Sequence, residues 1–162
     1  MSRTEHYDLA VIGSGQGGGP LAGTFARAGK RVALIERDHV GGTCVNEGCT
    51  PTKTMIASAR VAHVARRGDP YGVRTRDVEI DLPRVVARTR EIVSSFRSGS
   101  ENALAQAGVE LIRGDARFTG ARTIHIALLG KHDHQWCDSF PAPDASGTLS
   151  SARVLTLYTP PR

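Results

Sequence analysis

A strand–glycine–helix–strand pattern at the start of the chain constrains its fold more than any other feature. The apolar run at residues 7–12 is typical of a buried parallel strand, and residues 13–18 read Gly-Ser-Gly-Gln-Gly-Gly, which fits the spacing G-x-G-x-x-G. Apolar residues then recur at helical spacing as far as Gly29, which is suited to a left-handed helix cap. A second apolar run, residues 31–35, ends at Glu36. The order of these elements predicts a βαβ unit with parallel strands.

The glycines and the acid of this unit predict a dinucleotide site. Gly13, Gly15 and Gly18 allow a tight turn and let a pyrophosphate approach the helix N-terminus, where free N–H groups and the helix dipole favour negative charge. A carboxylate at Glu36 can accept hydrogen bonds from ribose hydroxyls and disfavours a 2′-phosphate, which favours FAD or NAD over NADP. A glycine-rich turn in an unrelated α/β protein is the alternative. We therefore predict an α/β chain with an incomplete, Rossmann-like three-layer fold around a central parallel sheet.

Two cysteines, Cys44 and Cys49, lie in the second informative stretch, residues 41–53, which reads Gly-Gly-Thr-Cys-Val-Asn-Glu-Gly-Cys-Thr-Pro-Thr-Lys. Residues five apart in a regular helix are separated by about 8.6 Å, whereas a disulfide needs Cα atoms roughly 4.4–6.8 Å apart. The two cysteines can therefore form a disulfide only if the chain between them bends. Asn46 and Gly48 tolerate such a bend.

The surroundings of the two cysteines favour a redox-active dithiol. A helix that begins near Thr50 would place Cys49 at its N-terminus, where a thiolate is stabilised, and Lys53 would add positive charge on the same side. Three alternatives compete with this interpretation. They are two buried free thiols, a zinc site that uses His39, and a structural disulfide, which a reducing compartment disfavours.

Apolar periodicity predicts the remaining elements. These are a helix that includes residues 57–65 and is broken at residues 66–70, a loop with a short extended piece over residues 73–80, a long helix capped by Asp81 and interrupted near residues 98–100, strands over residues 109–113 and 123–127, and a final strand over residues 151–158. From residue 128 the sequence becomes polar and loses its period. In that region His132, His134 and Cys137 have a spacing that could hold a metal ion, but a mobile polar loop is the simpler interpretation.

Composition limits the classes of partner. The net charge is +5, but the arginines are interleaved with acids and aromatic residues make up only 5% of the chain, so nucleic-acid binding is not expected. No apolar run is long enough to span a membrane, and no signal-peptide pattern precedes the first strand. We therefore expect a cytoplasmic protein, in which a close cysteine pair is more often catalytic or metal-binding than structural.

Together, the glycine motif, Glu36 and residues 41–53 resemble the flavin-dependent pyridine nucleotide–disulfide oxidoreductases. The Cys-Thr-Pro-Thr-Lys ending of that stretch and the helix that follows it are most similar to the mercuric-reductase-like branch of this family, which also includes dihydrolipoamide dehydrogenase. The resemblance extends over residues 6–127. It implies an N-terminal FAD-binding portion at residues 1–127 and an atypical or truncated tail at residues 128–162.

The resemblance also implies a role for each motif residue. The residues that would contact FAD are Gly13, Gly15 and Gly18 at the pyrophosphate, Glu36 at the adenosine ribose, Gly42 and Thr43 along the dinucleotide, the backbone of Ala116 at the adenine, and Lys53 near the reactive flavin nitrogen. Cys49 would be the charge-transfer thiol beside the flavin. Cys44 would be the exposed interchange thiol that reduces the substrate, and NAD(P)H would be the hydride donor.

Members of this family have much longer chains. A second glycine motif for NAD(P)H and the C-terminal interface domain, whose His–Glu pair acts as acid and base across the homodimer, are not found in this sequence. We therefore expect little turnover from this chain alone, and a small-molecule disulfide or mercuric ion as substrate of the complete enzyme. The alternatives are a noncatalytic dinucleotide-binding remnant and a thiol-based redox or metal-responsive binding protein.

Overall fold

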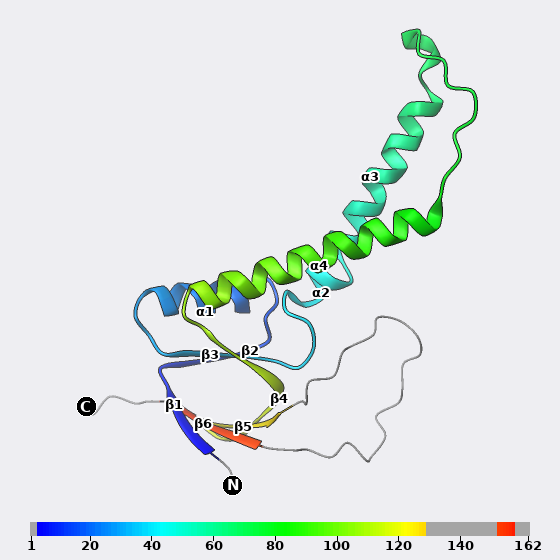
Figure 1. Cartoon of the computed structure of the whole chain (residues 1–162). Coiled ribbons are helices and arrows are strands. Elements are labelled where there is room, and N and C mark those ends of the chain that lie inside the picture. The colour runs from blue at the N-terminus through cyan, green and yellow to red at the C-terminus, as the bar shows by residue number, and fades with distance from the viewer. Residues whose placement is uncertain (1–2, 129–151, 158–162) are drawn as a thin grey trace, which may run out of the picture. The chain divides into compact units, whose positions relative to one another are not determined.

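The computed structural model describes residues 3–128 and 152–157, and the chain divides into two compact units. The first unit contains residues 1–38 and 103–162 and carries the strands, while the second contains residues 39–102 and is helical. Figure 1 labels the elements of both units. The first unit holds β1 (Arg3–Tyr7), β2 (Leu9–Ile12), α1 (Gly18–Arg27), β3 (Val32–Glu36), β4 (Glu110–Gly120), β5 (Thr123–Leu128) and β6 (Ala152–Leu157).

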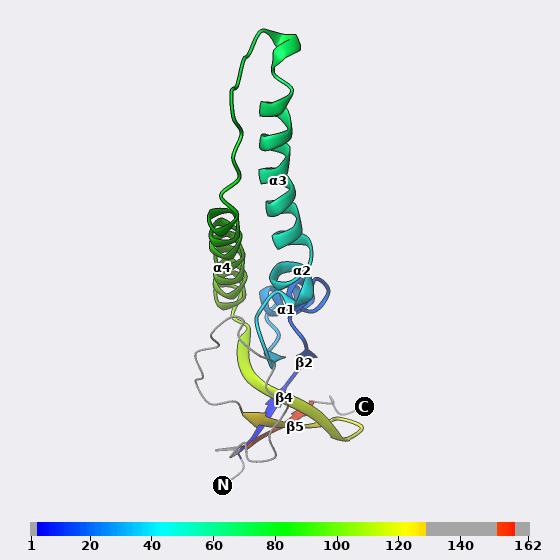
Figure 2. The same ribbon diagram turned by 90° about the vertical axis from the view of Figure 1, so that its right-hand side faces the viewer.

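The strands of the first unit form a sheet in the order β1-β6-β5-β4-β3-β2. β2, β3 and the first half of β4 are parallel, and Ala33 of β3 pairs with Ala10 on one side and Glu110 on the other. The second half of β4 pairs with β5 and β5 pairs with β6, both in antiparallel fashion, while β1 is parallel to β6. Figure 2 shows how β4 curves from one half of the sheet into the other. The predicted Rossmann-like α/β fold is confirmed, and its parallel strands continue into an antiparallel half.

The hydrophobic core of this unit forms around β3, whose five residues are all buried. An apolar run without alternation is typical of a strand that is covered on both faces, as residues 32–35 predict. Helix α1 packs on β2 and β3. Each buried isoleucine contributes roughly 1.5–3 kcal/mol to stability relative to an exposed one. The core cluster consists of Tyr7, Ala33, Ile35, Ile112, Ile124 and Ile126.

Asp8 divides the first predicted strand in two. Its backbone N–H donates to the Arg31 carbonyl at 2.9 Å, and its carboxylate accepts the Arg31 backbone N–H at 2.8 Å. These contacts bend the chain, so β1 ends at Tyr7 and β2 begins at Leu9. The expectation of one strand over residues 7–12 is therefore corrected, because the bend depends on a residue that is distant in sequence.

The second unit is built from helices. It holds α2 (Gly42–Asn46), α3 (Cys49–Arg66), the 3-10 turn η1 (Asp69–Tyr71) and residues 82–102 of α4 (Leu82–Gln106). The Asp81 carboxylate accepts the backbone N–H of Arg84 at 3.0 Å, which confirms the predicted cap at the start of α4. Residues 73–80 form no helix or strand, which confirms the predicted loop but not a strand for its short extended piece.

Helix α4 runs without a break, so the predicted interruption near residues 98–100 is wrong. A glycine such as Gly99 costs a helix only about 1 kcal/mol relative to alanine, which the rest of a long helix offsets. Ser100 donates its hydroxyl to the Phe96 carbonyl at 2.9 Å, one turn back, and so stays compatible with the helix. The predicted end of the helix at Gly108 is confirmed by its left-handed φ of +80°.

The C-terminal predictions have mixed outcomes. The final strand is confirmed as β6, and the strand predicted at residues 109–113 is longer, because β4 continues to pair with β5 as far as Gly120. The limits predicted for the FAD-binding portion and the tail stay a prediction. His132, His134 and Cys137 lie outside the described residues. Within the described ranges, no helix combines the length and the apolar content needed to cross a membrane.

Candidate functional site

Gly13 and Gly18 shape the turn between β2 and α1. Gly13 has a φ of +91°, which L side chains rarely adopt, and its N–H donates to the Ile35 carbonyl of β3 at 2.8 Å. A Cβ on Gly18 would lie 2.0 Å from the Gly13 carbonyl oxygen, whereas a Cβ on Gly15 would meet nothing within 4 Å. The backbone therefore requires glycine at positions 13 and 18, and the space beside Gly15 is open.

Glu36 is buried at the end of β3, where it is held by backbone and hydroxyl donors. Its Oε2 accepts the N–H and the hydroxyl of Ser14 at 2.9 and 2.6 Å, and its Oε1 accepts the N–H of Asp38 at 2.9 Å. Burial alone would raise the pKa of Glu36, but these hydrogen bonds outweigh burial and hold the pKa below its ordinary value of 4.5. Arg37 donates a further backbone hydrogen bond, so four protein donors already meet a carboxylate that accepts about four, and a ligand hydroxyl at Glu36 would share or displace one of them.

A cavity of about 320 Å³ brings Glu36 and Ala116 together in the first unit. It opens at the carboxyl ends of β2 and β3, which is where ligands bind to parallel α/β sheets. Its volume is at the lower end of the range of ligand sites, roughly 300–1,000 Å³. The lining residues are Ile12, Gly13, Ile35, Glu36, Arg37, Gly114, Asp115 and Ala116. The sequence motifs gave Gly13, Glu36 and Ala116, whereas Ser14, Arg37 and Asp115 stand at positions that the motif leaves variable.

Glu36→Gln is expected to remove part of the acid sensitivity of the fold. Because the native pKa lies below 4.5, the ionised group contributes stability above that pH, and this contribution is lost as the pH falls through the native pKa. We expect a loss of about 2 kcal/mol at pH 7, the size of a hydrogen bond to a charged acceptor, and a smaller loss at pH 3. Urea unfolding at both pH values measures the difference, with the exposed Glu91→Gln as a control. Equal losses at the two pH values would contradict this account.

The dithiol turn of the second unit, residues 42–49, has the bend that the cysteine spacing predicts. Helix α2 ends at Asn46, and α3 begins at Cys49. The Thr43 carbonyl accepts the N–H groups of both Glu47 and Gly48, at 2.9 and 2.6 Å, and this closes the turn. A Cβ on Gly48 would lie 3.0 Å from the same carbonyl oxygen, so glycine allows the close approach. The chain therefore turns back between the two cysteines.

Cys44 and Cys49 are free thiols that interact with each other, and Cys44 is partly buried while Cys49 is exposed. The hydrogen bond to Cys49 raises the pKa of Cys44, and burial and the negative charge of Cys49 act in the same direction. A hydrogen bond from the Cys49 backbone N–H and the charge of Lys53 lower the pKa of Cys44 but do not outweigh them. Cys44 therefore ionises less readily than an isolated cysteine. Two thiols in such contact are placed to form a disulfide.

The predicted site residues fall into two groups. Gly13, Gly15, Gly18, Glu36 and Ala116 lie in the first unit, and Gly42, Thr43, Cys44, Cys49 and Lys53 lie in the second. Within the described part of the chain, no three side chains of His, Cys, Asp or Glu are arranged to hold a metal ion. The backbone carbonyl of His39, the residue considered for zinc, accepts a hydrogen bond from the Asn46 amide.

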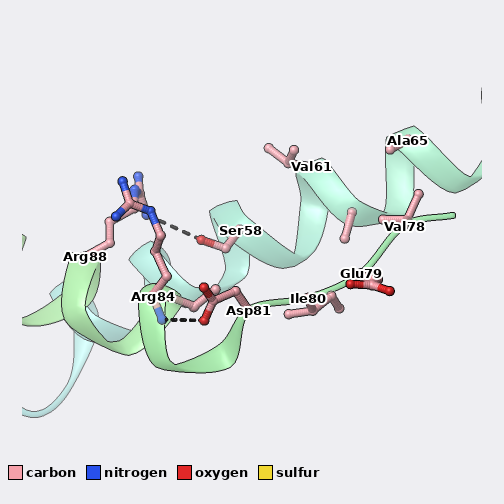
Figure 3. A pocket seen from close by; sticks show the side chains of 11 residues that line it. Ser58, Val61, Ala65, Val78, Glu79, Ile80, Asp81, Arg84 and Arg88 are labelled. Carbon is pink, nitrogen blue, oxygen red and sulfur yellow. Dashed lines mark hydrogen bonds between the residues drawn. The ribbon is translucent and has the colours of Figure 1, made fainter. Parts of the chain in front are cut away.

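A second cavity, of about 290 Å³, lies in the helical unit between α3 and residues 78–88 (Figure 3). Most of its lining is apolar, and Arg88 closes one end by donating to Ser58 Oγ at 3.5 Å and to the Thr54 carbonyl at 3.2 Å. None of the predicted site residues lines this cavity. Arg88, on α4, therefore braces this helix against α3.

Residues 7–137 match the family model described as pyridine nucleotide-disulphide oxidoreductase. Among similar proteins, a dihydrolipoyl dehydrogenase from Zymomonas mobilis is 40% identical over 116 residues, which cover 72% of this chain and 25% of the relative. A dihydrolipoyl dehydrogenase from Chlorobaculum parvum is 39% identical over 125 residues, or 77% of this chain and 27% of the relative. A mercuric reductase from Lysinibacillus sphaericus is 33% identical over 123 residues, or 75% and 22%. The chain thus spans about a quarter of the length of the curated relatives it matches.

Proposed function

Because the chain belongs to the pyridine nucleotide-disulphide oxidoreductase family, we propose that it is the FAD-binding and dithiol-bearing part of a disulfide oxidoreductase. In this proposal electrons pass from NAD(P)H through FAD to the Cys44–Cys49 pair and then to a substrate. The observation that carries it is the pair of free thiols at the two ends of a bent turn that leads into a helix. A pair of this kind exchanges two electrons by forming and breaking one disulfide bond.

The nucleotide site of the first unit supports FAD as the cofactor. Glu36 is ionised and anchored at the carboxyl end of β3, where a ribose hydroxyl would share its oxygens with backbone donors. The positive φ of Gly13 and the missing Cβ of Gly18 let the turn stay close to the N-terminus of α1. Gly13, Gly15 and Gly18 would hold the pyrophosphate, Glu36 the ribose and the Ala116 backbone the adenine. When bound, FAD supplies a carrier that takes a hydride from NAD(P)H and delivers two electrons to a disulfide.

The two thiols would divide the work on a disulfide substrate. The Cys44 sulfur attacks one substrate sulfur, the substrate disulfide breaks, and a mixed disulfide forms with Cys44. The Cys49 sulfur then attacks Cys44, so the second substrate thiol leaves and the Cys44–Cys49 disulfide forms. The two protein thiols lose two electrons and two protons, and the substrate gains both. The raised pKa of Cys44 agrees with the expectation that turnover needs a base to take its proton.

The substrate and the setting of the complete enzyme are part of the same proposal. Relatives named dihydrolipoyl dehydrogenase and mercuric reductase favour a small disulfide or a mercuric ion as the substrate. We further propose that Gly42 and Thr43 line the dinucleotide, that Lys53 lies near the flavin, and that Cys49 is its charge-transfer thiol. For the full-length enzyme we propose a homodimer in the cytoplasm.

Binding of FAD to the purified chain tests the proposal. We expect flavin fluorescence to change on titration with the wild-type protein, and Glu36→Gln to raise the dissociation constant at least tenfold, because it weakens a hydrogen bond to a charged acceptor. The exposed Glu91→Gln serves as the control and should bind like the wild type. Mild reduction of the complex should give a long-wavelength charge-transfer band that Cys49→Ser loses. A chain that is folded by circular dichroism and binds no FAD at millimolar concentration would contradict the proposal and favour a thiol-based binding protein.

A further inference from the structure

The Asn46 side chain joins the dithiol turn to helix α4 within the second unit. Only 4% of Asn46 is exposed. Its Nδ2 donates to the carbonyls of His39, Val40 and Gly42 at 3.4, 3.2 and 2.9 Å. Its Oδ1 accepts from both Nε and Nη2 of Arg97, at 3.0 and 2.9 Å. One buried amide thus ties the loop before α2 to a guanidinium 51 residues away in the chain.

The amide and the first thiol point to different sides of α2. Residues two apart in a helix differ by about 200° around its axis. Asn46 is buried, whereas Cys44 is partly exposed and faces Cys49. The hydrogen bonds of Asn46 therefore hold α2 on the side away from Cys44, and the Cys44 thiol stays accessible to react.

Arg97 is suited to this contact. A guanidinium is planar and presents two parallel N–H donors, so it fixes the orientation of an acceptor more strictly than a lysine ammonium does. Here both donors reach Oδ1 of Asn46. The charge of Arg97 strengthens these two hydrogen bonds, while the acceptor is a neutral amide and not a carboxylate. A neutral asparagine also provides two N–H donors, shared among the three nearby carbonyls, which an aspartate would lack.

We propose that Arg97 and Asn46 are positioning residues for the Cys44–Cys49 pair. By holding α2 against α4, they keep the Cys44 thiol facing the Cys49 thiol, and this raises the effective concentration of one thiol at the other. A higher effective concentration stabilises the disulfide relative to the open dithiol. This inference rests on the proposed function, because it requires the pair to cycle between dithiol and disulfide.

Equilibration with dithiothreitol tests the proposal on the full chain in a Cys137→Ser background. The protein dithiol gives two electrons and two protons to the cyclic disulfide of oxidised dithiothreitol, which becomes the dithiol. Alkylation and peptide mass spectrometry give the ratio of protein disulfide to dithiol. We expect Arg97→Met to lower this equilibrium constant about tenfold, which corresponds to about 30 mV. The equilibrium constant of Arg97→Lys should lie between those of the parent protein and Arg97→Met, because lysine keeps the positive charge but lacks the two parallel N–H donors of the guanidinium.

Arg90→Met is the matched control, since Arg90 is exposed on the same helix and its side chain makes no hydrogen bond to another described residue. Its equilibrium constant with dithiothreitol should match that of the parent protein. Asn46→Ala should lower the constant as well, and adding Arg97→Met to it should change little more if the two residues act as a pair. If circular dichroism shows that Arg97→Met is unfolded, the equilibrium constants of Arg97→Lys and of the double variant Arg97→Lys/Asn46→Ala test the positioning role instead.

The outcomes separate the two proposals. A parent protein that forms the Cys44–Cys49 disulfide while the Arg97 and Asn46 variants keep its equilibrium constant within twofold would overturn the positioning role alone. A folded parent protein that forms no such disulfide would contradict the proposed function, and the positioning role with it.

Discussion

Gly18→Ala is expected to lower the free energy of unfolding by about 3 kcal/mol, the upper end of the usual cost of overpacking. The added Cβ would lie 2.0 Å from the Gly13 carbonyl oxygen, far inside the contact distance of any two such atoms. The obstacle is backbone, and the Gly13 N–H is itself bonded to the Ile35 carbonyl of β3. The turn can therefore make room only by breaking its link to the sheet. For a chain of this length, the loss corresponds to a fall in Tm of roughly 6–12 °C.

Gly17→Ala provides the matched control, one residue away. Gly17 has a φ of −91° and a ψ of −48°, which alanine adopts freely, and nothing lies within 4 Å of its added Cβ. We expect its unfolding free energy to change by less than about 1 kcal/mol, the cost of alanine at a helix cap. Urea unfolding of both variants, followed by circular dichroism, measures the difference. If the two variants unfold at the same urea concentration, the close approach of Gly18 to Gly13 does not limit the fold.

The sequence predicts those parts of the fold that depend on neighbouring residues. β3 follows from its unbroken apolar run, and α1 from its helical spacing and the cap at Gly29, which has the expected left-handed φ of +79°. The bend at Asp8 was missed because it depends on Arg31, which no local pattern connects to it. The interruption of α4 was wrongly predicted because the long helix on both sides of Gly99 outweighs the low helix propensity of one glycine.

The candidate site divides in the same way. Gly13, Gly18 and Gly48 were predictable because each meets a steric demand of its own turn. The hydrogen bonds of Ser14 to Glu36 and of Arg97 to Asn46 were not, because they join residues far apart in the chain at positions that the motifs leave open. Spacing thus identifies the reactive groups, whereas the groups that hold them in place become visible only in the folded chain.

Cys49→Ser is expected to abolish the Cys44–Cys49 disulfide and, at the same time, to make Cys44 ionise more easily. In the wild-type pair the hydrogen bond to Cys49, together with burial and the charge of that sulfur, raises the pKa of Cys44. Serine carries no charge near neutral pH, so the variant loses the first and the third of these effects. The pKa of Cys44 should fall toward or below its ordinary value of 9.0, because the charge of Lys53 continues to lower it.

Alkylation by iodoacetamide between pH 7 and pH 10 measures this change, because the thiolate is the reacting form. In a Cys137→Ser background, peptide mass spectrometry follows Cys44 alone, and we expect faster alkylation in Cys49→Ser than in the parent at pH 8. Lys53→Met should have the opposite effect, since it removes the positive charge and raises the pKa of Cys44 further. An unchanged pH profile for Cys44 in Cys49→Ser would mean that the two sulfurs do not share a proton. The cysteines would then act as two independent thiols, and the dithiol chemistry proposed for this chain would lose its physical basis.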